Sequence, residues 1–259
     1  GWQWGGGWLA AKGFSDFAGS TLVHAAGGAA ALAGAIVLGP RLGRFAKGAL
    51  TTPYAASSIP LATLGVFVLW FGWFGFNGGS QLALGTFDDA KSISTIFINT
   101  NLAACAGVMV NAVITRVIGG KTDVVMMLNG ALGGLVAITA EPLAPSPFAA
   151  ICIGGIGAAI VVIGASVLEK FKIDDVVGAI PVHLFAGIWG TLAVPITNAD
   201  TTFATQFLGT FSVVAFMFIV SLVVWFILKS TVGIRTSDEA QKKGTDVAEI
   251  GVVAYAIRD

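Results

Sequence analysis

Apolar residues occur along this chain in blocks that are long enough to cross a lipid bilayer. Charged and turn-forming clusters separate seven such blocks, at residues 17–39, 60–86, 92–115, 123–140, 147–168, 176–196 and 203–230. A membrane-spanning helix needs about 20 predominantly apolar residues. The pattern therefore predicts an all-α membrane protein with seven transmembrane helices.

Two further stretches flank these blocks. Gly1 to Leu9 is interpreted as the end of a preceding helix, and it lacks the initiator methionine and basic segment of a signal peptide. Residues 233–259 follow the last block and are richer in charge. We therefore divide the chain into a transmembrane domain at 1–232, expected to be incomplete on its N-terminal side, and a C-terminal tail at 233–259.

The basic residues indicate how the helices are oriented. The segments that connect successive predicted helices lie alternately on the two sides of the membrane. Those on one side carry only Lys12 and Lys91 as basic residues. Those on the other side, which include the tail, carry Arg41, Arg44, Lys47, Arg116, Lys121, Lys170, Lys172, Lys229, Arg235, Lys242, Lys243 and Arg258. Because cytoplasmic loops of membrane proteins are enriched in Lys and Arg, the tail is expected to lie in the cytoplasm.

The composition excludes several other classes of protein. Hydrophobic residues make up 56% of the 259 residues, charged residues 11%, and the formal net charge is zero. These values exclude a disordered chain and a protein that binds nucleic acid through clustered positive charge. Cys105 and Cys152 lie inside apolar blocks, where they are expected to be buried as small hydrophobes rather than to form a disulfide or a metal site.

An internal repeat is the most informative feature of the chain. The segments Asp16–His24 and Asp175–His183 share Asp, Gly, Val and His at the same offsets, and a glycine follows each histidine four residues later. These are the only two histidines. The second copy lies five helices after the first, so the two helices cross the membrane in opposite directions, as in an inverted repeat with a site near the midplane. Each unit would then have five helices, and most of the first four are expected to be absent from this chain.

The two histidines are candidate functional residues. Each lies eight residues after an aspartate, which corresponds to about 12 Å along a helix and places it inside the hydrocarbon layer. Ionisable residues at that depth usually face a pore or a partner, although two neutral histidines bonded to helix carbonyls are the structural alternative. A pair of neutral imidazoles in edge-to-edge contact would share one proton and line a narrow path.

Acidic and aromatic residues near the helix ends are further candidates. Asp16 and Asp175 are expected to cap their helices, and Asp16 also to favour a cation at the outer surface. Phe76 and Ser80 are one helical turn apart, so together they would bind a small cation through cation–π attraction and one hydrogen bond. Ordinary helix packing is the alternative for this pair. Trp4 fits an interfacial aromatic belt.

Several segments together resemble the ammonium transporter (Amt/Mep/Rh) family, on the Amt side. They are DFAGSTLVH, WFGFNGGS, NTNLAACAG, LNGALGGLVAITA and IDDVVGAIPVHLFAGIWGTLAV, in this order along nearly the whole chain. The resemblance implies an inverted-repeat fold of eleven helices, two units of five plus a last helix, assembled as a homotrimer. The seven blocks would be the fifth to the eleventh helices.

The resemblance also implies roles by position. His24 and His183 match the twin pore histidines, Asp16 the acidic residue of the outer mouth, Trp4 and Ser80 the external ammonium recruitment site, Phe76 one phenylalanine of the gate, and Thr139 a pore-lining threonine. The chain departs from the family pattern at three places: Leu184 stands where many members have glycine, Gly178 where many have aspartate, and Ile250–Val252 where the cytoplasmic regulatory segment has His-Gly-Glu.

The function implied by the resemblance is transport of ammonium or ammonia through a hydrophobic pore in the plasma or inner membrane. The implied partners are ammonium, the lipid bilayer, further copies in a homotrimer and a PII-type signalling protein at the cytoplasmic face, with no nucleic acid and no cofactor. A non-conducting ammonium sensor or structural membrane subunit is the alternative. A b-type haem protein with His24 and His183 as axial ligands ranks lower because no second histidine pair or propionate-binding arginine lies within the spans. An enzyme is least expected, since no nucleophile–base pair or phosphate loop is recognisable.

Overall fold

The computed structural model describes residues 1–46 and 56–254, and within these ranges every regular element is a helix. In chain order the elements are α1 (Trp8–Ala11), η1 (Ser20–Ala25), α2 (Ala26–Leu38), α3 (Ile59–Gly79), α4 (Phe87–Gly119), α5 (Val124–Ile138), α6 (Pro147–Lys170), η2 (Pro181–Phe185), α7 (Ala186–Thr197), α8 (Phe203–Thr231), α9 (Asp238–Lys243) and η3 (Asp246–Ile250). The labels η1, η2 and η3 denote π-helical turns, of which η1 continues directly into α2 and η2 into α7.

All seven predicted apolar blocks contain a helix, and five of these helices are long and apolar enough to span a membrane. The other two, Val124–Ile138 and Pro181–Thr197, are shorter than predicted. The 15 residues of α5 cover about 22 Å, less than the roughly 30 Å of a bilayer core. Almost all of α5 from Asn129 onward is buried between other helices, so this part is covered by protein rather than by lipid, while Val124 and Val125 at its start are exposed.

Helix ends differ from the prediction where polar side chains fix them. The helix in the second block ends at Gly79, whereas the block was predicted to reach residue 86. The next helix begins at Phe87, five residues before the predicted start at residue 92. A capping box causes this early start: the Thr86 hydroxyl accepts from the Asp89 N–H while the Asp89 carboxylate accepts from the Thr86 N–H. In residues 1–9, predicted as the end of a preceding helix, the structure has turns followed by a short helix, α1, that begins at Trp8.

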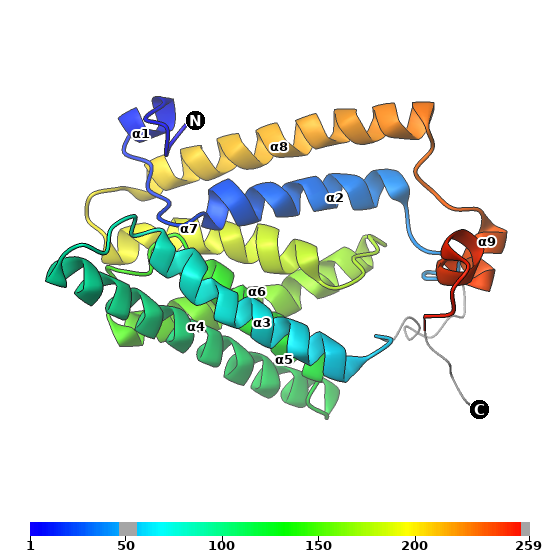
Figure 1. The fold of residues 1–259 in the computed structure, drawn as a ribbon, viewed down its shortest axis with the longest axis horizontal. Coiled ribbons are helices and arrows are strands. Elements are labelled where there is room, and N and C mark those ends of the chain that lie inside the picture. Colours follow the sequence, from blue (N-terminus) through cyan, green and yellow to red (C-terminus); the bar gives the residue numbers. More distant parts are fainter. Residues whose placement is uncertain (47–55, 255–259) are drawn as a thin grey trace.

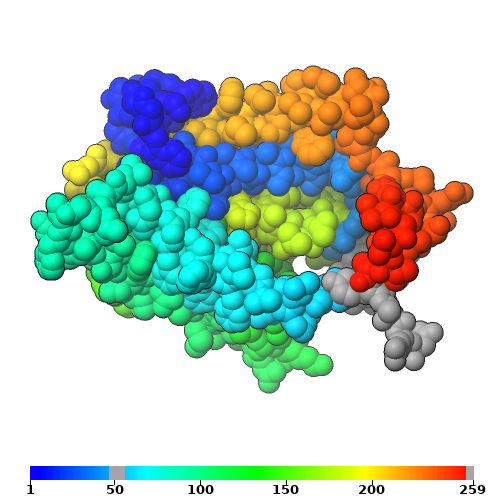
Figure 2. Space-filling model, viewed as in Figure 1, coloured from blue at the N-terminus to red at the C-terminus, as the bar shows by residue number. Residues whose placement is uncertain are grey.

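The long helices run side by side along one direction (Figure 1). α8 lies along α2, while α4, α5 and α6 pack closely against one another. α1 and α9 lie at opposite ends of the bundle (Figure 1), which we call the Asp16 end and the Asp174 end after an aspartate at each. Figure 2 shows α9 and η3 against the Asp174 end. The elements η1 and η2 contact each other inside the bundle, and so they place the two repeat segments together.

Glycines allow the helix backbones to approach closely. A Cβ atom added to Gly107 in α4 would meet the carbonyl group of Gly130 in α5, and one added to Gly130 would meet that of Gly107. Gly134 in α5 and Gly154 in α6 face the Ala103 backbone in the same way. Small residues at crossings are how membrane helices gain van der Waals contact without a hydrophobic driving force. These glycines therefore fix the spacing of α4, α5 and α6.

The glycine after each histidine lies at a further crossing, that of the two repeat helices. A Cβ on Gly28 would collide with the backbone of Leu184, directly after His183. A Cβ on Gly187 would collide with the carbonyl oxygen of Ser20, at the start of η1. Each repeat thus supplies a bare stretch of backbone on which the other repeat packs.

The prediction that both cysteines are buried is wrong. Cys105 and Cys152 are exposed on the surfaces of α4 and α6. Both lie on faces of their helices that point away from the described part of the bundle. Apolar neighbours along the sequence therefore did not imply that these side chains are buried within the chain.

The α4–α5 crossing yields a stability prediction. Gly107→Ala forces a methyl group against the Gly130 carbonyl and should destabilise the fold by about 1–3 kcal/mol, the usual range for overpacking. Gly72→Ala in α3 is the matched control, because that position faces open space and alanine favours helix. We expect Gly107→Ala to lower the apparent melting temperature of the detergent-solubilised protein in circular dichroism and Gly72→Ala to leave it unchanged or higher. Equal melting temperatures for the two variants would contradict this packing.

Candidate functional site

The structure brings the two repeat histidines into direct contact. The Nδ1 atoms of His24 and His183 lie 3.1 Å apart, and the two rings are inclined by only 16°. A hydrogen bond between two neutral imidazoles requires that one Nδ1 carries the proton and the other accepts it. His24 is nearly fully buried, and its Nε2 atom has no hydrogen-bond partner among the described residues. The pair thus leaves an unused imidazole nitrogen inside the bundle.

Both histidines lie in π-helical turns at the start of their helices. Such turns are rare and occur frequently at functional sites. A glycine three residues after each aspartate, Gly19 or Gly178, has positive φ. This left-handed backbone turns the chain so that the following amides point back at the aspartate.

Asp16 organises the start of the first repeat helix. Its carboxylate accepts four backbone N–H groups at 2.8–3.1 Å, from Gly19, Ser20, Thr21 and Leu22. The side chain is fully buried, and this burial raises the pKa of Asp16 to about 6 although the four N–H groups act in the opposite direction. Asp16 therefore holds the four amides that open the His24 helix.

Asp175 has the corresponding contacts in the second repeat. Its carboxylate accepts from the N–H groups of Gly178, Ala179 and Ile180 at 2.7–3.0 Å. These amides have no carbonyl partner one turn earlier, so the carboxylate satisfies them. Both histidines are thus held by a turn whose first amides are bound to an aspartate.

Two aromatic rings of α3 lie against the imidazole of His24. The Trp73 ring is stacked on His24 with centroids 5.0 Å apart and a 14° inclination, and the Phe76 ring lies 5.4 Å away. The sequence analysis assigned no role to Trp73. Its position three residues before Phe76, on the same helical face, was the available signal.

Hydrogen bonds from two other helices fix the Trp73 ring. Its indole Nε1–H donates to the hydroxyl of Thr139, which directly follows α5, at 2.9 Å. Asn77, one turn after Trp73, donates to Thr100 of α4 at 3.0 Å. Thr139, expected to line the pore, therefore serves here as the acceptor that sets the plane of the indole and, through stacking, that of the His24 imidazole.

The residues expected to recruit a cation lie at the Asp16 end. The indole of Trp4 is 56% exposed and donates to the Asp16 carbonyl oxygen at 2.9 Å. The Ser80 hydroxyl donates to the Phe76 carbonyl oxygen of its own helix at 2.8 Å. Among the described residues no hydrogen bond or ring contact joins Trp4 to Ser80. The structure therefore places Trp4 with Asp16 and Phe76 with His24.

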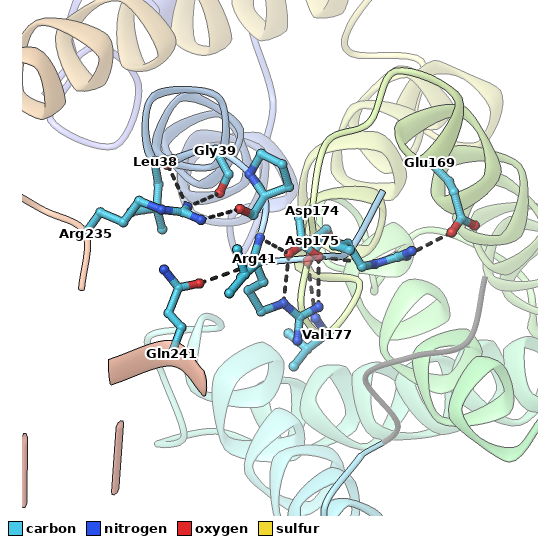
Figure 3. A network of polar contacts seen from close by, with 12 residues as sticks. Leu38, Gly39, Arg41, Glu169, Asp174, Asp175, Val177, Arg235 and Gln241 are labelled. Atoms are coloured by element: carbon cyan, nitrogen blue, oxygen red, sulfur yellow. Dashed lines mark hydrogen bonds and ion pairs between the residues drawn. The ribbon is translucent and has the colours of Figure 1, made fainter. Parts of the chain in front are cut away.

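A cluster of charged side chains lies at the Asp174 end (Figure 3). The Arg41 guanidinium forms a two-pronged ion pair with Asp174 at 2.8 Å, and Arg44 pairs with Glu169 at the same distance. The hydrogen bond from Arg41 holds the pKa of Asp174 below its usual range. Arg41 follows α2 and Asp174 precedes η2, so the pair ties together the two repeat helices.

The C-terminal segment contacts the same turn. Arg235 donates to the carbonyl oxygens of Leu38, Gly39 and Pro40 at 2.7–3.3 Å, and the Gln241 side chain accepts from the Leu42 N–H (Figure 3). A cavity of about 900 Å³ opens at this end of the bundle and reaches His183, and its lining includes Arg41, Asn129, Leu132 and Val182. Of the two histidines, His183 therefore lines this cavity at the Asp174 end.

Comparison with known proteins identifies the family of the chain. A family model described as the Ammonium Transporter Family matches residues 1–255. The chain is 40% identical to ammonium transporter Amt2 of Archaeoglobus fulgidus over 98% of its own length and 60% of that protein, and 36% identical to the ammonium transporter of Bacillus subtilis over 98% and 64%.

Two solved structures are similar to the whole fold. A structure titled Sensor Amt Protein has a TM-score of 0.87 at 35% identity, with 94% of this chain and 62% of the other covered. Mep2 of Candida albicans has a TM-score of 0.82 at 29% identity, with 96% and 59% covered. The chain spans about 60% of the length of the relatives it matches.

The Arg41–Asp174 ion pair predicts a pH-dependent stability difference. The pKa of Asp174 is lower in the folded chain than the value of about 3.9 in an unfolded one, so the pair stabilises the fold above about pH 4 and is lost as the pH falls through the folded pKa. We expect Asp174→Asn to melt at a lower temperature than the wild type at pH 7, and the difference to shrink towards pH 3. Asp88→Asn, at an exposed aspartate of α4 that forms no ion pair among the described residues, is the control for loss of a carboxylate and should change the melting temperature at pH 7 less than Asp174→Asn does. A pH-independent difference for Asp174→Asn would refute the electrostatic origin.

Proposed function

The chain belongs to the ammonium transporter family, and from this premise we propose that the His24–His183 pair is the centre through which it conducts ammonium or ammonia across a membrane. The observation that carries the proposal is the direct Nδ1–Nδ1 contact between two histidines of an inverted repeat, inside a bundle of membrane-length helices. A structural pair would use its remaining nitrogens on helix carbonyls. The free Nε2 of His24 instead remains available to a small polar substrate.

Recruitment would occur at the Asp16 end. Trp4 and Phe76 present aromatic faces, which attract a small cation, and the Asp16 carboxylate contributes negative charge behind them. Ser80 adds a hydroxyl whose lone pairs stay free while its proton is donated to Phe76. Ammonium would be bound there before it enters the apolar part of the path.

The histidine pair can pass a proton without forming a persistent buried charge. If the Nε2 of one imidazole accepts a proton from ammonium, the proton on its Nδ1 moves to the Nδ1 of the partner, whose own Nε2 then releases a proton on the far side. The shared hydrogen bond of 3.1 Å is the geometry this transfer needs. Ammonia, now uncharged, would follow along the same path.

Selectivity against metal cations follows from the same chemistry. Potassium cannot become neutral by losing a proton, and an isolated ion in apolar surroundings is strongly disfavoured. Ammonium can leave its charge behind as a proton. A narrow path lined by Trp73, Phe76 and neutral imidazoles would therefore pass ammonia and exclude potassium.

The membrane setting follows from the loop charges and the family. With twelve basic residues on the tail side against two on the other, the Asp16 end would face outward and the Asp174 end and the tail the cytoplasm, in a plasma or inner membrane. We further propose that the protein works as a homotrimer and that its cytoplasmic face is a docking surface for a PII-type signalling protein.

A second candidate function is ammonium sensing without conduction. The observation that favours it is the 0.87 TM-score to a structure titled Sensor Amt Protein. A sensor would bind ammonium at the Asp16 end and change conformation without net transport. Ammonium-dependent spectral changes with no accompanying current would support this function over transport.

Replacement of either histidine tests the proposed transport. In cells that lack other ammonium transporters, we expect His24→Ala and His183→Ala each to reduce ammonium-evoked current by about 100-fold or more, the lower end of what a proton-transfer group contributes. Cys105→Ser, on an exposed face of α4, is the control and should retain the wild-type current. Wild-type currents in both alanine variants, at matched protein amounts in the membrane, would contradict a role in conduction.

A further inference from the structure

Gln206 is a fully buried polar side chain that the repeat does not account for. It lies in the first turn of α8, outside both repeat segments. Its Nε2 group donates to the carbonyl oxygens of Ser15 at 2.6 Å and Thr191 at 3.0 Å, and its Oε1 accepts from the Ser15 N–H at 2.9 Å. The amide therefore binds both polar groups of one residue's backbone.

Ser15 directly precedes Asp16, the aspartate that caps the His24 helix. On the other side of Asp16, Phe17 and Ala18 donate their backbone N–H groups to the carbonyls of Ala140 and Thr139. The short segment Ser15–Ala18 is thus bound by Gln206 on one side and by the end of α5 on the other. The position of the Asp16 carboxylate depends on both attachments.

Thr191, whose carbonyl oxygen accepts from Gln206, belongs to α7, which continues from the His183 turn. Its hydroxyl lies 2.7 Å from that of Thr21, in the His24 turn, and Thr21 in turn lies 3.1 Å from Thr210 of α8. Gln206 therefore connects the segment that leads into the first histidine helix with the helix that follows the second histidine. It does so at the end where a cation would enter.

We propose that Gln206 is a positioning residue for ammonium recruitment: it sets the relative position of the two histidine helices at the Asp16 end and holds Asp16 and its carbonyl beneath Trp4. The inference rests on the transport function proposed above and goes beyond it. Gln206 acts through the backbone of Ser15 and Thr191 and forms no hydrogen bond with either histidine among the described residues. Trp4 binds the Asp16 carbonyl oxygen, so a shift of the Ser15–Asp16 peptide displaces the aromatic face as well.

The chemistry at this position requires a primary amide. It must donate two hydrogen bonds and accept two, from the Ser15 N–H and the Thr201 hydroxyl, in a buried site, which asparagine and glutamine side chains can do. A glutamate would present a carboxylate to two carbonyl oxygens, and a methionine would leave three buried backbone groups without partners.

The test compares four variants of the natural protein by half-saturating ammonium concentration and by maximal current per molecule in the membrane. Gln206→Glu and Gln206→Met are expected to raise the half-saturating concentration about tenfold, as the loss of one or two hydrogen bonds implies, with a smaller change in maximal current. Gln206→Asn, which keeps the amide on a shorter side chain, should lie between them and the wild type. Ser15→Ala is the matched control, because Gln206 contacts only the backbone of Ser15, and it should equal the wild type.

A pH profile separates positioning from a general loss of structure. Because Asp16, with a pKa of about 6, also titrates in this range, each variant is compared with the wild type at the same pH. Relative to the wild type, the Glu variant should regain part of its affinity at acidic pH, where a neutral carboxyl can again donate one hydrogen bond, while the Met variant should not. Unchanged half-saturating concentrations in all Gln206 variants would overturn the inference. So would a result in which the Glu and Met variants only reduce the amount of protein in the membrane while the Asn variant behaves as wild type. If the wild type shows no ammonium-evoked current, the transport function fails instead, and that result is distinct from any difference among variants.

Discussion

The two repeat helices can bring their histidines together because neither has a side chain where they cross. Gly28 and Gly187 occupy equivalent places in the repeat, and a Cβ atom on either would collide with backbone of the other helix. At this spacing the Nδ1 atoms of His24 and His183 come within hydrogen-bonding distance. A separation larger by the width of a methyl group would break that contact, so the candidate site depends on close packing of two backbones.

The rest of the bundle keeps polar groups paired around this crossing. Asp16 and Asp175 bind the amides that open the histidine turns, the Thr139 hydroxyl accepts the Trp73 indole, and Gln206 pairs with the backbone beside Asp16. Unpaired polar groups are strongly disfavoured in apolar surroundings, so such contacts favour one arrangement over its neighbours. Among the described residues five buried side-chain polar atoms lack a hydrogen-bond partner, and the Nε2 of His24 is the one that belongs to the histidine pair.

Much of the fold and the centre of the site could be predicted from the sequence. The apolar blocks located the seven helices, and the duplicated Asp…His…Gly spacing predicted that two helices of opposite direction would bring their histidines together. The bridge made by Gln206 could not be predicted, because its partners lie on other segments and no short-range spacing links them, whereas Trp73 was signalled only by its spacing to Phe76. The exposure of Cys105 and Cys152 escaped prediction for a related reason: the blocks are apolar all round, so their pattern does not show which face the bundle covers.

The most direct test of the account is the protonation pattern of the histidine pair, which can be measured by solid-state NMR on the protein in lipid with ¹⁵N-labelled histidine. The chain has only two histidines, so their signals are easily assigned. We predict that at neutral pH one Nδ1 carries a proton and the other does not, and that a coupling across an N–H···N hydrogen bond joins them. Two rings that both lack a proton on Nδ1, or two imidazolium ions, would contradict the shared hydrogen bond on which the proposed path depends.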